Sequence, residues 1–298
     1  MEFRFVDWDS SYNDVILLNF TIILLIFCGL RKYFGIIANI NASTELLEKN
    51  NTAFGISLAA ITFAVAILLK GAIYGELANN MIDSSIAVGL YSIIGIGLMA
   101  VTRVIFDNIA LPNISIRKEI LQGNKSAAII DAGNVIATAI IISTVMSWIT
   151  TNTIERISIL LVGYIISQII LTSTTYLRVK IFQRQNNQLS IEEVFKTGNI
   201  ALALRFAGRK IGTAFAIAAA SHIVSYELDY MYILLANWFL VSIIMVIILS
   251  TLSAIADATV LYKIDANKEI LQKNNIAIGA LQGILYISLG FLLSELVL

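Results

Sequence analysis

The sequence predicts an all-α protein that crosses a membrane about eight times, and three observations carry this prediction. The 298-residue chain is 58% hydrophobic and 13% charged, with a mean hydropathy of +0.84, whereas a soluble domain has about 25% charged residues. Eight stretches reach the roughly 20 apolar residues that a membrane-spanning helix needs. The single proline, Pro112, falls between two of these stretches, so we expect no proline-kinked helix.

The eight expected helices follow one another through short connections. The first fourteen residues hold four carboxylates and lack the basic start of a cleavable signal peptide. The first apolar stretch is therefore expected to remain in the protein as a helix. We place the helices at residues 15–34, 53–74, 84–106, 126–148, 157–177, 199–221, 231–254 and 275–296.

Lysine and arginine gather in alternate connections, and this asymmetry predicts the orientation. The connections after the first, third, fifth and seventh helices are basic, whereas the opposite side offers Arg4 and Arg156. Because cytoplasmic loops carry the excess of basic residues, we expect both termini on the outer side. The basic residues are Arg31, Lys32, Lys49, Arg117, Lys118, Lys125, Arg178, Lys180, Arg184, Lys196, Lys263, Lys268 and Lys273.

An internal repeat divides the chain into halves. Residues 107–133 align without a gap to residues 257–283, and both contain the run Lys-Glu-Ile-Leu-Gln. The offset is half the chain, and each half would contain four helices. An even number of helices gives both halves the same orientation, which predicts a parallel repeat. We expect the two repeats at residues 1–150 and 151–298.

A finer repeat marks the start of every second helix. Polar residues that can cap a helix stand before these helices, namely Asn51, Asn124, Asn199 and Asn274. The same helices are rich in alanine and glycine, whereas the intervening ones carry bulky side chains. Since small residues allow close helix packing in membranes, we expect an inner layer of the second, fourth, sixth and eighth helices.

Two stretches resemble a known family. Residues 47–72 look like the second helix, and residues 268–292 like the last helix, of the bacterial inner-membrane domain of unknown function 350 family (YjfL-like proteins). The family's Asn-x-x-Ala helix start occurs here in four places, although Gly198 replaces the first asparagine in the third. A typical member resembles half of this chain, so the resemblance implies two fused units in a bacterial inner membrane. It supplies no catalytic residues.

Ionisable and amide side chains inside the expected helices form the candidate site. The alignment of helix starts puts Asp131 and Arg205 at equivalent positions, where they could neutralise each other if their helices touch. One interpretation is a path for an ion or a substrate between the halves, and the other is a buried pair that fixes helix register. The expected polar seam consists of Asp131, Asn134, Arg205, Arg209 and Lys210.

Two further acids stand at expected helix ends. Asp107 and Asp257 occupy matching positions at the cytoplasmic ends of the third and seventh helices, and Arg103 precedes Asp107 by one turn. We expect local pairing and solvation there.

Several functional classes are disfavoured. One histidine and one cysteine leave no metal cluster to build, zero net charge gives no reason to expect nucleic acid as a partner, and no phosphate-binding or hydrolase motif is present. We therefore expect no metal, no cofactor and no enzymatic activity.

Two hypotheses remain for the function. The first is a channel or transporter for an ion or small charged solute. The second is a scaffold in the lipid bilayer that recruits a cytoplasmic protein through residues 31–52 and 178–198. A homo-oligomer is compatible with either.

Overall fold

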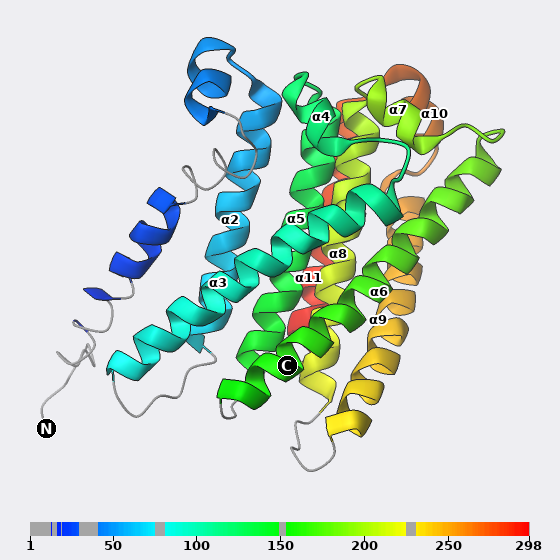
Figure 1. Cartoon of the computed structure of the whole chain (residues 1–298). Helices are drawn as coiled ribbons and strands as arrows, with labels where there is room; N and C mark the ends of the chain where they lie inside the picture. Colours follow the sequence, from blue (N-terminus) through cyan, green and yellow to red (C-terminus); the bar gives the residue numbers. More distant parts are fainter. Residues whose placement is uncertain are drawn as a thin grey trace, which may run out of the picture.

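The computed structural model describes residues 41–74, 81–148, 153–224 and 231–297, together with 13, 17–18 and 20–29. Every regular element in these residues is a helix (Figure 1). The long helices are α2 (Thr52–Tyr74), α3 (Met81–Ile105), α5 (Lys125–Trp148), α6 (Thr153–Gln185), α8 (Ile200–Ile223), α9 (Met231–Val260) and α11 (Ile276–Leu296). The short ones are η1 (Thr44–Glu48), η2 (Phe106–Ala110), α4 (Ile116–Leu121), α7 (Ile191–Lys196) and α10 (Ala266–Lys273).

Six of the eight expected spans are confirmed as helices long and apolar enough to cross a membrane: α2, α3 with η2, α5, α6, α9 and α11. Helix α8 has 24 residues but carries three cations within its first half, which lower its hydropathy. Of the first expected span, residues 15–34, the structure describes 17–18 and 20–29, with an apolar helix over Phe20–Gly29 that is shorter than a full span; the remainder lies outside the described residues.

Helices α2, α5, α8 and α11, which we call the layer, pack against each other in that order. In the view of Figure 1, α11 lies behind α5 and α8. Burial is greatest in the middle of this row. In the apolar segment of α5, 78% of residues are buried, against 44% in α2 and 28% in α11. Helices α2 and α11 are therefore the open ends of the layer.

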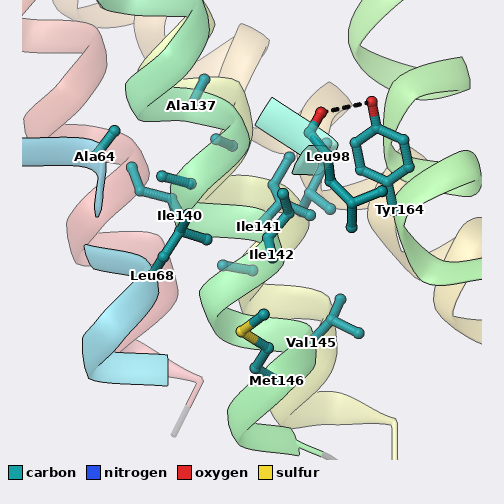
Figure 2. Packing of buried hydrophobic residues seen from close by; sticks show 14 of the residues in the cluster. Ala64, Leu68, Leu98, Ala137, Ile140, Ile141, Ile142, Val145, Met146 and Tyr164 are labelled. Atoms are coloured by element: carbon teal, nitrogen blue, oxygen red, sulfur yellow. Dashed lines mark hydrogen bonds between the residues drawn. The ribbon is translucent and has the colours of Figure 1, made fainter. Parts of the chain in front are cut away.

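The other long helices cross over this layer. Helix α3 lies against α2 and α5, α6 against α5 and α8, and α9 against α8 and α11. Figure 2 shows the core where α5 meets α2, α3 and α6. In this core the Tyr164 hydroxyl lies 2.9 Å from Thr102 Oγ1 and 3.1 Å from the carbonyl oxygen of Leu98.

Glycine brings the backbones of the layer into contact. A Cβ atom added to Gly133 of α5 would lie 2.6 Å from Cα of Ala207 in α8. One added to Gly208 of α8 would lie 2.3 Å from Cα of Gly283 in α11. Side chains larger than hydrogen have no room at these crossings, which explains the glycine and alanine content of the layer helices.

Each layer helix starts from the same junction. A short helix ends at a residue with positive φ, namely Asn50, Gly123, Gly198 or Asn274. The next residue is an asparagine whose Oδ1 accepts a hydrogen bond from the amide three residues later. These caps are Asn51, Asn124, Asn199 and Asn275.

The fourth cap is therefore Asn275, one residue after the expected Asn274. The reason lies in the second junction, where Asn124 follows Glu119 by five positions, whereas Asn275 follows Glu269 by six. The second junction is thus one residue shorter than the fourth. An alignment without a gap is displaced by one position in every residue that follows.

Candidate functional site

A closed polar cluster lies where α2, α3 and α5 meet. We call Ser57, Arg103 and Asp131 the first seam. Arg103 forms an ion pair with Asp131, and its Nε donates to Oδ1 of that carboxylate at 3.0 Å. Ser57 Oγ donates to Asp131 Oδ2 at 2.5 Å and accepts from Arg103 Nη2 at 3.1 Å. Both carboxylate oxygens are bonded, so the charge of the buried acid is compensated within the protein.

The partner of Asp131 is therefore Arg103, not Arg205 as the sequence suggested. Asp131 points to the α2 side of α5, whereas the α8 side of α5 is reached two residues later, at Gly133. Matched depth in an alignment gives no information about which side of a helix a residue occupies. The one-residue displacement at the second junction also made the positions of Asp131 and Arg205 look equivalent.

The same three positions recur in the second half with different residues. Counted from the capping asparagines, the serine of the first seam corresponds to Arg205 and its aspartate to Gln282. Its arginine corresponds to Ser253, which stands 150 residues later, four positions before the aligned stretch in each half. We call Arg205, Ser253 and Gln282 the second seam, which belongs to α8, α9 and α11.

The second seam is not closed by its own side chains. Arg205 Nη1 donates to Asn267 Oδ1 at 2.7 Å. In contrast, Arg205 Nε, Ser253 Oγ and Gln282 Oε1 are buried with no hydrogen-bond partner among the described residues. Ser253 and Gln282 are each only 2% exposed. Buried polar atoms are nearly always paired, so each of these three atoms indicates a partner supplied by water or a ligand.

A second group of polar side chains continues the seam along α8. Arg209 Nη2 donates to the Tyr286 hydroxyl at 2.6 Å, and the Arg209 guanidinium carbon lies 4.7 Å from the centre of that ring. Tyr286 in turn donates to Asp257 Oδ2 at 3.1 Å. Arg209 Nε and Asp257 Oδ1 are again buried and unpartnered within the described chain. The charge of Arg205 lies close enough to interact with both.

Two more cations lie beside this group. Lys210 is buried, and its Nζ lies 3.9 Å from the centre of the Phe106 ring, a cation–π contact. Arg178 of α6 donates from Nη2 to Thr213 Oγ1 at 2.8 Å. Arg178 interacts electrostatically with Arg209 and Lys210. Arg178, Arg209 and Lys210 thus interact in sequence around α8, and Arg205 interacts with Arg209 and Asp257, which gives this group more cations than carboxylates.

The expected single seam is divided in the structure. Asp131 belongs to the first seam, Arg205 and Arg209 face α11, and Lys210 lies against η2. Asn134 is buried on α5 with an unpartnered Nδ2 atom among the described residues.

The two expected helix-end acids differ from each other. Asp257 accepts a hydrogen bond from Tyr286, and Asp107 lies half-buried in η2. Asp257 thus belongs to the polar group beside α8, whereas Arg103, one turn before Asp107, pairs with Asp131.

Reasoning from the sequence missed several participants: Ser253, Gln282, Tyr286, Asn267 and the pairing role of Arg103. A signal for the first two was present. Allowing a one-residue gap before Asn124 aligns Asp131 with Gln282. The offset of 150 residues that holds before the gap aligns Arg103 with Ser253. The partner of Arg209, in contrast, depends on helix packing, which the alignment does not contain.

Outside the apolar segments, matching carboxylates bind the helix junctions. Glu45 accepts hydrogen bonds from Lys49 at 2.7 Å and from Asn51 at 3.0 Å. These bonds hold the pKa of Glu45 below its ordinary value. Hydrogen bonds from Asn275 and then Lys273 lower the pKa of Glu269 in the same way. Their common role is to join a short helix to the asparagine cap that follows it.

No metal site accompanies these groups. In the part of the chain that the structure describes, no group of three or more His, Cys, Asp or Glu side chains is placed to hold a metal ion.

Comparisons with known proteins agree with a repeated membrane domain. The family described as Domain of Unknown Function (DUF350) matches the chain twice, over residues 10–146 and 148–297. A protein of Aquifex aeolicus (strain VF5) described as a UPF0719 transmembrane protein is 29% identical over 102 residues. That match spans 34% of this chain and 38% of the relative. No solved structure matches.

Proposed function

The chain belongs to the Domain of Unknown Function (DUF350) family, of which it holds two tandem copies, and from this premise we propose that it transports a small anion across the membrane. The binding site is the second seam with the adjoining Arg209, Tyr286 and Asp257. The protein needs no cofactor for this role and acts as a carrier, not as an enzyme.

One observation carries the proposal. Among the described residues, five buried polar atoms of Arg205, Arg209, Ser253, Asp257 and Gln282 have no hydrogen-bond partner, three of them donors and two acceptors, and they belong to α8, α9 and α11. Uncompensated charge inside a membrane is costly, and such residues commonly line ion or substrate pathways. A bound anion would accept hydrogen bonds from the arginine and serine donors and compensate the charge of the arginines.

The distribution of polar residues along α8 favours a transporter over an open channel. The polar positions run from Arg205 to Thr213, and Arg205 reaches Asn267 of α10 at the partly exposed end. The following segment, residues 214–220, is almost entirely alanine and isoleucine and is mostly buried. An anion could enter from the α10 end, but crossing the apolar half requires a second arrangement of the helices.

The proposed topology follows from the same residues. We take α8 and the segment around Phe20–Gly29 as two further spans, which gives eight in two parallel repeats. Packing between α5 and α11 shields the charges of α8 from lipid. The basic connections then place α4, α7 and α10 on the cytoplasmic side of a bacterial inner membrane, with both termini outside.

The scaffold hypothesis has less support. Residues 178–185 continue α6, and Ile191 and Phe195 of α7 are buried in the core. Most of residues 178–198 is exposed or half-buried, but no buried unpartnered atom among them indicates a ligand, and residues 31–40 of the other basic connection lie outside the described residues.

Anion uptake into liposomes containing the purified protein tests the proposal. We expect uptake of radiolabelled chloride, phosphate or formate, with a fall to the level of empty vesicles in a variant carrying Arg205→Gln and Arg209→Gln. Arg184→Gln, an exposed change at the end of α6, is the matched control and should leave uptake unchanged. Uptake of none of the three anions, or uptake that survives the double substitution, would overturn the proposal.

A further inference from the structure

Two of the three contacts within the layer use the same pair of positions. The residue nine positions after one capping asparagine meets the residue eight positions after the next. Gly133 meets Ala207 in this way, and Gly208 meets Gly283. Helices α2 and α5 pack in the same order along the layer. Each layer helix thus has an outgoing face, toward the next helix, and an incoming face, toward the previous one.

Among the described residues, α2 has an incoming face but no preceding helix of the layer. On α11, the incoming face consists of Gly279, Gly283, Tyr286 and Gly290, which lie 4, 8, 11 and 15 residues after the cap. The same positions in α2 are Gly55, Ala59, Thr62 and Ala66.

These four residues of α2 line an open groove. It has a volume of about 540 Å³ and is completed by Leu58, Phe63, Leu46 and Phe27. In α5 and α8 the corresponding small residues are buried against a neighbour, among them Ala128, Ala139, Ala203 and Ala214. The groove is therefore the packing surface of the layer, left uncovered at its first helix.

Helix α11 has an outgoing face but, in the described chain, no following helix of the layer. The outgoing face of α8 includes Ala201, Leu204, Gly208 and Gly212, all of which touch α11. The same positions in α11 are Ala277, Ala280, Ile284 and Ser288, and all four are exposed. Ile284, at the position of the closest contact, brings a side chain large enough to occupy the α2 groove.

The polar junctions repeat the same order. Asn51 donates to the carbonyl of Ile120 at the end of α4, at 3.1 Å. Asn124 donates to the carbonyl of Phe195 in α7 at 3.0 Å, and Asn199 to that of Ile270 in α10 at 2.9 Å.

Each cap therefore binds the short helix of the following unit. Asn275 donates to its own Glu269, and the described chain holds no further short helix for it. The short helix without an incoming asparagine is η1, at the other end of the layer.

From these three matches we propose that copies of this protein assemble head to tail, with α11 of one copy packed in the α2 groove of the next. The Asn275 amide of one copy then donates to the last carbonyls of η1 in its neighbour. The contact joins two different surfaces, so repetition produces a ring if the rotation closes and an open row if it does not.

The first helical segment fits this arrangement. Helices α3, α6 and α9 each contact two neighbouring helices of the layer. Residues 20–29 precede α2 as α3 precedes α5, and Phe27 already lines one side of the groove. Phe20, Leu24 and Leu25 are at least 60% exposed. A neighbouring α11 would supply the second helix that this segment lacks.

Disulfide cross-linking in membranes tests the contact. In a Cys28→Ser background, which removes the native thiol, Ala59→Cys and Ile284→Cys occupy the two positions that meet in the internal contacts. Two tagged single variants, expressed together and oxidised, should give a mixed dimer, because backbones this close satisfy disulfide geometry. The two changes in one chain should give a ladder of dimers, trimers and larger species.

Three controls separate head-to-tail contact from other associations. Each single variant alone should remain a monomer on a denaturing gel. Ile247→Cys on the exposed side of α9, expressed with Ala59→Cys, should not cross-link. Self-linking of Ala59→Cys alone, or no product from the mixed pair, would overturn the proposal.

A groove-filling change gives an independent measurement without cysteine. Native mass spectrometry of the wild type should show complexes of two or more copies, and Ala59→Phe should shift them to monomers while the melting temperature of the monomer is retained. A wild type that is monomeric in lipid nanodiscs would also contradict the assembly. Neither result depends on whether the protein transports an anion.

Discussion

The two polar seams occupy corresponding positions in the two halves of one chain, yet only the first is complete. In the first seam both oxygens of Asp131 are bonded, by Arg103 and Ser57. In the second, Gln282 replaces the acid, and the arginine has moved from the crossing helix to the layer helix as Arg205. Duplication thus left one seam that compensates its own charge and one that needs an external group to do so.

The comparison indicates that corresponding positions of one fold can stabilise the protein in one half and bind a ligand in the other. A buried ion pair must be closed on both sides to offset its loss of hydration. In the second seam Ser253 and Gln282 stand where the first has arginine and aspartate, so the seam holds the cation Arg205 and no carboxylate. An anion from solution would supply the negative charge that the second seam lacks.

The largest expected effect comes from opening the first seam. Asp131→Asn leaves Arg103 without its carboxylate in the interior, and breaking such a buried pair costs about 3 kcal/mol or more. We expect a clearly lower melting temperature in lipid nanodiscs. Adding Arg103→Gln should recover most of the loss, because the two changes remove one interaction. Additive losses in the double variant would contradict a direct pair.

Closing the second seam should have the next largest effect. Gln282→Glu keeps the length of the side chain and adds a carboxylate beside Arg205, as in the first half. We expect anion uptake to fall at least tenfold, and the melting temperature to stay the same or rise. Gln282→Met, also of similar length, is the control for loss of the amide alone. Unchanged uptake in the glutamate variant would show that this position does not contact the anion.

The comparison requires α8 and α11 to approach as closely as the helices around the first seam. Gly208→Ala would place a Cβ atom 2.3 Å from the backbone of Gly283. We expect a loss of about 1–3 kcal/mol in stability, typical of overpacking. Gly97→Ala on α3, where a Cβ atom meets nothing within 4 Å, is the matched control. Equal melting temperatures for the two variants would show that the α8–α11 contact is looser than described.

The smallest effect concerns the helix junctions and pH. The pKa of Glu45 is lowered from its ordinary value of 4.5 by hydrogen bonds from Lys49 and Asn51. Its stabilisation is therefore complete above about pH 4.5 and is lost as the pH falls through the lower, folded-state pKa. In thermal unfolding, Glu45→Gln should differ from the wild type at pH 7 and converge with it below pH 4.

The more exposed Glu269→Gln should show the same trend with a smaller difference at pH 7, since solvent screens exposed pairs. A difference between Glu45→Gln and the wild type that grows as the pH falls would contradict the assigned hydrogen bonds.

Much of the architecture could be predicted from the sequence, because it depends on length, apolarity and local capping. Six spans and three of the four asparagine caps were found where the pattern placed them. The fourth cap, Asn275, was missed through a one-residue difference in junction length. The partner of Asp131 could not be found in the same way, since it comes from α3 and depends on which side of α5 faces which helix.

The most direct test of the central claim is anion-dependent thermal stabilisation of the purified protein, compared between Arg103→Gln and Arg205→Gln. An anion that binds only the folded state raises the melting temperature, and the rise grows with the logarithm of the anion concentration divided by its dissociation constant. The second seam, as the binding site, predicts that Arg205→Gln loses this rise. Arg103→Gln should melt lower but keep the full rise with added anion. Loss of the rise in Arg103→Gln but not in Arg205→Gln, or in neither, would contradict the account.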